Sequence, residues 1–84
     1  MTRIHFIASA TDSAQEGLAA LTARYGQTPL DEAEVIVPLG GDGLMLATLH
    51  RMTGRPVYGM NRGTVGFLMN EYGEDDLIGR IRAA

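Results

Sequence analysis

The chain has 84 residues and a formal net charge of −3, with seven arginines, no lysine and ten acidic residues. Apolar residues make up 45% of it and charged residues 20%, a balance typical of one globular domain, and no apolar run is long enough to cross a membrane. Scattered arginines argue against a nucleic-acid surface, while the absence of cysteine and of an export signal predicts a cytoplasmic protein without disulfide bonds.

The first half of the chain predicts a strand, a helix and a second strand. Apolar residues alternate from Ile4 to Ala8, as in a short strand. Ser13 and Glu16 have the spacing of a capping box, which begins a helix that Gly26 ends. After a polar loop, the almost continuous apolar run from Val35 to Leu39 predicts a strand that is covered on both faces.

The second half repeats this alternation. We expect a helix from Leu44 to Met52, a strand from Val57 to Met60, a glycine-bearing loop from Asn61 to Asn70 and a last helix from Asp75 to Arg82. The order β-α-β-α-β-loop-α predicts a single α/β domain over residues 1–84, three-layered and Rossmann-like, with a parallel sheet. Both glycine-rich segments follow strands and should therefore lie on the carboxyl edge of that sheet.

The most informative segment is Gly40, Gly41, Asp42 and Gly43, between a predicted strand and a predicted helix. Backbone N–H groups and the positive end of the helix dipole would suit an anion there. The absence of lysine excludes a Walker A loop, and the glycine spacing excludes the dinucleotide fingerprint. A carboxylate at this place can hold a metal ion, orient a hydroxyl or take its proton. The alternative is a tight turn in which Asp42 caps the following helix.

The second glycine-rich segment contains Gly59, Asn61, Gly63 and Gly66 within a few residues. Such a segment suggests backbone that lies close to a ligand or adopts positive φ angles, and the alternative is an ordinary long turn. Arg62 lies in it and could pair with a phosphate, or could simply be solvated.

Taken together, the two segments resemble the NAD kinase family. In that family a strand ending in Gly-Gly-Asp-Gly is followed, one helix and one strand later, by Gly-x-Asn-x-Gly-x-x-Gly-Phe-Leu, and the chain has every fixed position of both motifs. Diacylglycerol kinases, sphingosine kinases and phosphofructokinases share the first motif. The second motif, at this separation, points to NAD kinases, and the resemblance extends from the first predicted strand to the last helix.

The resemblance implies a reaction and a set of site residues. NAD kinases transfer the terminal phosphoryl group of ATP, or in some members of polyphosphate, to the 2′-hydroxyl of the adenosine ribose of NAD. Asp42 matches the catalytic acid of the family, and Phe67 matches an aromatic residue that lies against the adenine, although Phe67 could instead pack in the core. The cofactor-binding residues implied in this way are Gly40, Gly41, Gly43, Asn61, Arg62, Gly63, Gly66 and Phe67.

The resemblance also implies Mg²⁺ or another divalent cation, held chiefly through the nucleotide phosphates. We assign no residue as a metal ligand. His5 and His50 are isolated from other ligands, and the acidic run from Glu74 to Asp76 is explained by the start of a helix.

The chain also departs from the family pattern. NAD kinases have a second, β-rich domain that adds an Asn-Glu pair to the dinucleotide site and forms the oligomer, and Asn70 and Glu71 match that pair in letters only. We therefore expect these 84 residues alone to self-associate and to be inactive, and the intact protein to be a homo-oligomer without nucleic-acid or membrane partners. Two alternatives stay open: a lipid or sugar kinase of the same superfamily, and a non-enzymatic nucleotide-binding module in which Asp42 would be replaceable.

Overall fold

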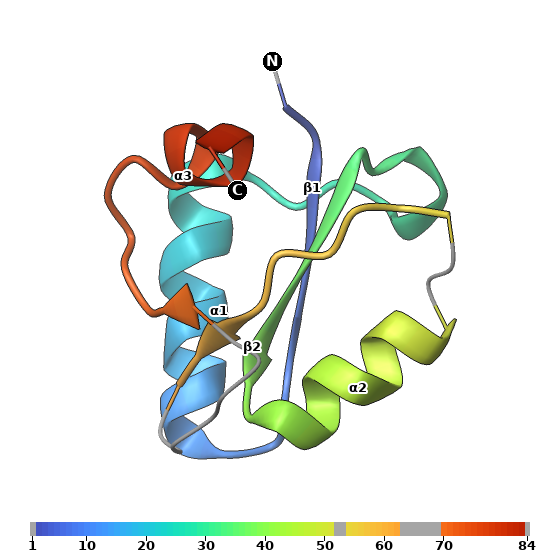
Figure 1. Ribbon diagram of the computed structural model, residues 1–84. Coiled ribbons are helices and arrows are strands. Elements are labelled where there is room, and N and C mark those ends of the chain that lie inside the picture. Colours follow the sequence, from blue (N-terminus) through green and yellow to red (C-terminus); the bar gives the residue numbers. More distant parts are fainter. Residues whose placement is uncertain (1, 52–53, 63–69, 84) are drawn as a thin grey trace.

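A computed structural model describes residues 2–51, 54–62 and 70–83 of the chain. The described residues form a parallel sheet of four strands, in the order β1-β2-β3-β4, with helices on both faces (Figure 1). The strands are β1 (Ile4–Ala8), β2 (Val35–Gly40), β3 (Met60–Asn61) and β4 (Asn70–Glu71), and the helices are α1 (Asp12–Tyr25), the short 3₁₀ turn η1 (Leu30–Glu32), α2 (Asp42–Arg51) and α3 (Leu77–Ala83). The predicted α/β class with a parallel sheet is confirmed.

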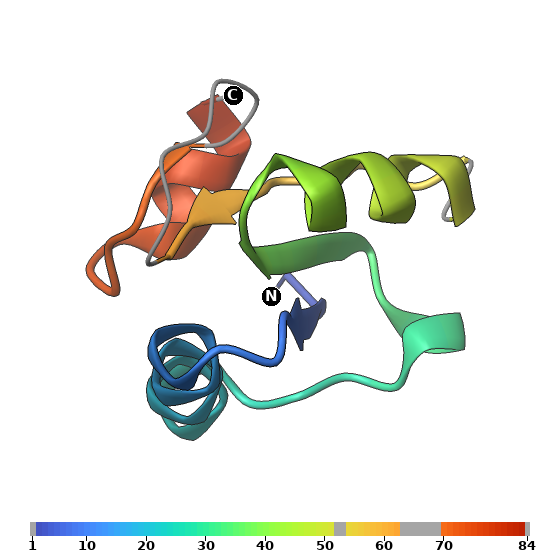
Figure 2. The same cartoon turned by 90° about the horizontal axis from the view of Figure 1, so that it is seen from below.

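Side chains pack against both faces of the strand β2. Its residues Val35, Val37 and Leu39 share one buried cluster with side chains of β1, α1 and α3. Successive side chains of a strand point to opposite faces, so Ile36 and Pro38 lie on the face that α2 covers, and both are fully buried. The view from below in Figure 2 shows α1 and α2 on opposite sides of the strands. The prediction of a strand covered on both faces is confirmed.

The beginning of α1 corrects one expectation. The hydroxyl of Thr11 accepts a hydrogen bond from the Ala14 N–H at 3.3 Å, and the helix begins at Asp12. Ser13 already lies inside the first turn, so the predicted capping box is wrong and the cap lies two residues earlier. The predicted end is confirmed, because Gly26 has a φ of 81° and donates its N–H to the Thr22 carbonyl.

The third strand is shorter than predicted. Val57 forms an isolated bridge with Ile36, and the regular pairing resumes only at Met60, so β3 has two residues. Ile36 donates its N–H toward this neighbouring segment, to the Pro56 carbonyl. The N–H of residue 38 would point the same way, and a proline there has none to donate. The sequence thus places a break in the ladder where a continuous strand was expected.

The last two elements also differ from the expectation. The strand β4 pairs in parallel with β3 and was not predicted, because two residues carry no periodic pattern. The helix α3 begins at Leu77, two residues later than expected, and Asp76 just before it has a φ of 51°. The acidic run instead joins α3 to the end of α1: Arg24 pairs with Asp75 at 2.7 Å, and Tyr25 donates its hydroxyl to the Glu74 carbonyl.

Strand β1 lies at the edge of the sheet, and one side chain occupies its open side. The amide oxygen of Gln27 accepts the Phe6 N–H at 2.8 Å, and the amide nitrogen donates to the Phe6 carbonyl at 2.9 Å. Next to it, Thr28 donates its N–H to the Ile4 carbonyl at 3.0 Å. Gln27 thus takes the hydrogen-bonding place of a neighbouring strand and blocks pairing with another chain at this edge.

The contacts of Gln27 predict a measurable loss of stability. We expect Gln27→Ala to lower the free energy of unfolding by about 1 to 2 kcal/mol, because two backbone groups of Phe6 lose their partner. Gln15→Ala is the control, since the side chain of Gln15 donates an exposed hydrogen bond to the Ser9 carbonyl, and its removal should cost less than about 0.5 kcal/mol. Urea unfolding followed by circular dichroism measures both. Equal unfolding midpoints for the two variants would contradict the prediction.

Candidate functional site

The carboxyl ends of β2 and β3 bring the two glycine-rich motifs together. In the register of these strands Leu39 pairs with Met60 and Gly40 pairs with Asn61. The N–H of Arg62 then donates to the Gly40 carbonyl at 2.9 Å. The first motif and the beginning of the second therefore meet at one edge of the sheet, as predicted.

Asp42 is the first residue of α2, which begins two residues earlier than predicted. The first hydrogen bond of the helix runs from the Met45 N–H to the Gly41 carbonyl at 3.2 Å, so Gly41 stands at the cap position. The alternative in which Asp42 itself caps the helix is therefore wrong. Its carboxylate lies in the first turn, partly buried, where the helix dipole stabilises a negative charge.

The glycines of the first motif differ in their surroundings. A Cβ atom added to Gly40 would lie 2.6 Å from the Ser9 hydroxyl oxygen and 3.2 Å from the Ser9 Cβ. The close approach of Ser9, whose N–H donates to the Leu39 carbonyl at 3.0 Å, therefore requires glycine at residue 40. A Cβ atom added to Gly43 would meet no described atom within 4 Å. The packing of the described residues therefore does not explain why residue 43 lacks a side chain.

Asn61 carries a polar atom that the described part of the chain does not satisfy. Its side-chain oxygen is buried and accepts no hydrogen bond from any described residue. Buried polar atoms in proteins almost always have a partner, so such an atom needs an explanation. The end of β3 beside Gly40 therefore offers an acceptor for a donating group such as a hydroxyl.

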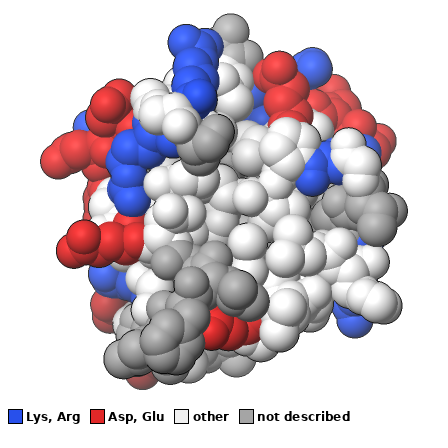
Figure 3. Space-filling model, viewed as in Figure 1, with Lys and Arg blue, Asp and Glu red and all other residues white. Residues whose placement is uncertain are grey.

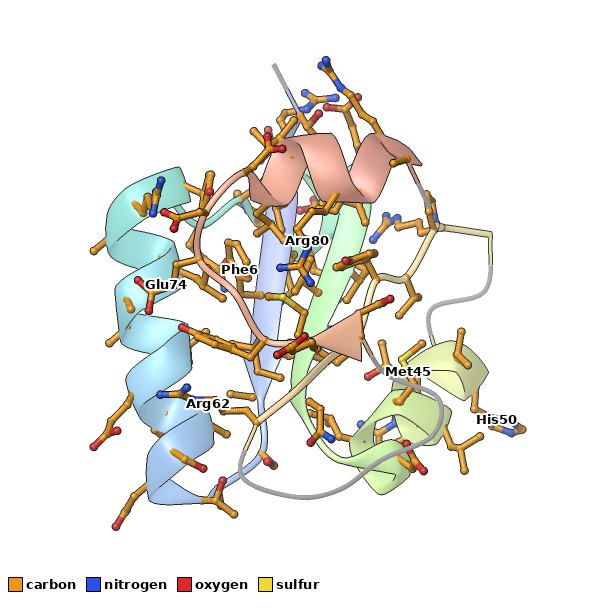
Figure 4. The ribbon with its side chains drawn as sticks, turned by 60° about the vertical axis from the view of Figure 1, so that its left-hand side comes forward. Phe6, Met45, His50, Arg62, Glu74 and Arg80 are labelled. Carbon is orange, nitrogen blue, oxygen red and sulfur yellow. The ribbon has the colours of Figure 1, made fainter. Side chains whose placement is uncertain are left out.

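Arg62 is tied to its surroundings on several sides. Its Nε donates to the Ser13 carbonyl at 2.8 Å, and its guanidinium carbon lies 4.2 Å from the centre of the Tyr72 ring. Figure 4 shows the side chain lying along the first half of α1. The expectation of a solvated arginine is therefore wrong, whereas pairing with a phosphate stays a prediction.

The remaining predicted residues divide into two groups. Gly63, Gly66 and Phe67 lie outside the described residues, so their predicted roles stay predictions. Sequence reasoning missed Tyr72 and Gly17, which pack against Arg62. Gly17 carried a usable signal, because a glycine in the interior of a helix lowers helix stability and often marks a close approach.

Charged groups at the site are few. In the described part of the chain no group of three or more His, Cys, Asp or Glu residues is placed to hold a metal ion. His5 instead contacts the Thr28 carbonyl through Nδ1 at 2.8 Å, and His50 is exposed on α2. Figure 3 shows a face whose centre is uncharged, with acidic and arginine side chains mostly along its margin and one further acidic group below the centre. A single carboxylate such as Asp42 suits Mg²⁺ where substrate phosphates supply further oxygen ligands.

The described helices are short. Not one of them combines the length and the apolar character that a membrane-spanning segment needs.

Known proteins match almost the whole chain. The family model of the ATP-NAD kinase N-terminal domain matches residues 8–78. A NAD kinase of Cereibacter sphaeroides (strain ATCC 17025) is 63% identical over 84 residues, which are 98% of this chain and 33% of the relative. A NAD kinase of Caulobacter vibrioides is 55% identical over 86 residues, which cover 100% of this chain and 33% of the relative. A NAD kinase of Xylella fastidiosa (strain Temecula1) is 54% identical over 84 residues, which cover 98% of this chain and 32% of the relative.

The chain thus spans about a third of the length of these curated relatives. No solved structure matches it.

The different surroundings of the two glycines predict opposite effects of the same substitution. Gly40→Ala should lower the free energy of unfolding by about 1 to 3 kcal/mol, because the new methyl group collides with Ser9. Gly43→Ala should change it little or raise it by up to about 1 kcal/mol, because alanine favours a helix and the space is open. Thermal unfolding of both variants checks this pair. A similar destabilisation by the two substitutions would show that the packing argument is mistaken.

Proposed function

Because the chain belongs to the NAD kinase family, we propose that the full-length protein transfers a phosphoryl group from ATP, or from polyphosphate, to the 2′-hydroxyl of the adenosine ribose of NAD. The observation that carries the proposal is the position of Asp42. It starts α2 directly after β2, on the edge where Gly40 pairs with Asn61. A carboxylate, the N–H groups of a helix start and a buried amide oxygen therefore lie along one edge of the sheet.

The geometry suits the chemistry of phosphoryl transfer. Such a reaction needs an in-line arrangement of nucleophile and phosphorus, stabilisation of charge and an oriented hydroxyl. In the proposed step the ribose 2′-oxygen forms a bond to the terminal phosphorus while the bond from that phosphorus to the leaving phosphate oxygen breaks. The proton of the hydroxyl passes to the carboxylate of Asp42. The N-terminal turn of α2 favours the negative charge of a phosphate nearby.

The other residues of the edge have supporting roles in this proposal. Gly40, Gly41 and Gly43 allow phosphates and ribose to approach the backbone, and the lack of a described neighbour beside a Cβ at Gly43 supports this assignment. The buried oxygen of Asn61 accepts a hydrogen bond from a ribose hydroxyl. For Phe67, Gly63 and Gly66 the proposal rests on the family motif alone, with Phe67 lying against the adenine.

A divalent cation fits this arrangement. At the start of α2 the carboxylate of Asp42 would supply one ligand to the cation, and phosphate oxygens of the substrates would supply the others. When bound, such a cation neutralises charge on the transferred phosphoryl group.

The substitution Asp42→Asn in the full-length protein tests the proposal. We expect NADP formation to fall by about 10²-fold or more, because the hydroxyl loses its proton acceptor, while the dissociation constant of NAD changes little. A coupled assay measures turnover, and isothermal titration calorimetry measures binding. Asp12→Asn is the matched control, since Asp12 is likewise the first residue of a helix and should leave turnover unchanged.

The acceptor must be tested on the unmodified full-length protein. Labelled ATP and polyphosphate are offered as donors, with NAD or diacylglycerol as acceptor. Label on diacylglycerol in place of NAD would favour a lipid kinase. Nucleotide binding without transfer, unaffected by Asp42→Asn, would favour a regulatory binding module.

A further inference from the structure

Arg62 joins three segments at the carboxyl edge of the sheet. Its backbone N–H donates to the Gly40 carbonyl at 2.9 Å, which connects it to the end of β2. Its Nε donates to the Ser13 carbonyl at 2.8 Å, which connects it to the first turn of α1. Its guanidinium carbon lies 4.2 Å from the centre of the Tyr72 ring, directly after β4. One side chain and its own backbone thus hold together parts of the chain that are far apart in sequence.

Tyr72 is itself held in place. Its hydroxyl donates to a carboxylate oxygen of Glu74 at 3.0 Å. Burial and the carboxylate of Glu74 raise the pKa of Tyr72 above its usual value and outweigh the opposing effect of the Arg62 charge. The phenol therefore keeps the proton that it donates to Glu74. The ring lies against α1 at Gly17, where an added Cβ atom would be 3.0 Å from the ring and 3.4 Å from Nε of Arg62. A larger residue at position 17 would therefore push both side chains away.

These contacts use the features that distinguish arginine from lysine. A planar guanidinium can stack on an aromatic ring and donate in a fixed direction at the same time, whereas an ammonium group cannot do both. The stack occupies one face of the guanidinium and the bond to Ser13 occupies Nε. These two contacts fix the orientation of the guanidinium against α1 and Tyr72.

We propose that Arg62 is a positioning residue rather than a phosphate ligand. Together with Ser13, Gly17 and Tyr72 it forms a clamp that holds the end of β3 against β2 and so fixes Asn61 relative to Asp42. The inference rests on the proposed function. In this inference the clamp keeps NAD in the position that phosphoryl transfer requires. A displacement of about 1 Å in such a site can reduce turnover about 10²-fold.

Three variants of the full-length protein test the clamp by kinetics: Arg62→Lys, Tyr72→Leu and the double variant. We expect each single variant to lower kcat about 10- to 100-fold and to change KM for ATP less than about 3-fold. The double variant should be no slower than the slower single variant, because the two side chains act as one unit. Tyr72→Phe, which keeps the ring but loses the hydrogen bond to Glu74, should lower kcat less than Tyr72→Leu does.

A phosphate ligand would behave differently. In that case Arg62→Lys would keep most of kcat, because lysine also binds phosphate, and would mainly raise KM for ATP, while Tyr72→Leu would have little effect. That pattern would overturn the proposal. Arg24→Lys is the matched control, since Arg24 lies 5.5 Å from the centre of the Tyr25 ring at the other end of α1 and should leave kcat unchanged.

Amide hydrogen exchange gives a readout that does not depend on activity. After correction for intrinsic rates, the backbone N–H of residue 62, which is bonded to the Gly40 carbonyl, should exchange at least about 10-fold faster in Arg62→Lys and Tyr72→Leu than in the unmodified protein and in Arg24→Lys. Unchanged exchange would overturn the clamp, and faster exchange with unchanged kcat would overturn its role in placing NAD. If the unmodified protein forms no NADP, the proposed function is refuted. Faster exchange in the two variants would then still support the clamp as the contact that holds β3.

Discussion

The burial of β2 on both faces is the constraint on which the rest of the structure depends. All six of its residues are buried, so its backbone groups must be satisfied by neighbouring strands and its side chains by helices on two sides. β1 pairs along its whole length, α1 and α3 cover one face and α2 covers the other. The chain leaves β2 at Gly40 and enters α2 at Asp42, so the position of the candidate base follows from the packing of this one strand.

Much of this arrangement is readable from the sequence, because its signals are local. The continuous apolar run predicts β2, glycine ends α1, and the order of elements predicts a parallel sheet whose edge collects both motifs. The errors lie where a tertiary contact decides. Thr11 caps α1 in place of Ser13, and β4 exists only because it pairs with β3. The partners of Arg62 were also missed, since Ser13 lies 49 residues away along the chain and no local pattern joins the two.

Packing does not account for every glycine of the first motif. Gly40 is required by the chain itself, because Ser9 approaches too closely for any side chain. A Cβ atom at Gly43 would meet no described atom outside its own helix within 4 Å, so the packing of the described residues does not require glycine there. Packing among the described residues thus accounts for one glycine of the motif and leaves the other unexplained. Asp42 lies between these two glycines, at the start of α2, and the packing of α2 against β2 determines its position.

The carboxyl end of β2 and the carboxyl end of β3 differ in how many backbone hydrogen bonds fix their position. Asp42 belongs to a ten-residue helix on a fully buried strand, whereas Asn61 belongs to a strand of two residues. Pro38 has no N–H to donate toward β3, which interrupts the ladder between the bridge at Val57 and the pair at Met60. With fewer backbone bonds, the end of β3 depends more on side chains for its position. The stacked and hydrogen-bonded Arg62 lies directly after that weak point, where a side-chain tie has the most effect on the geometry of the site.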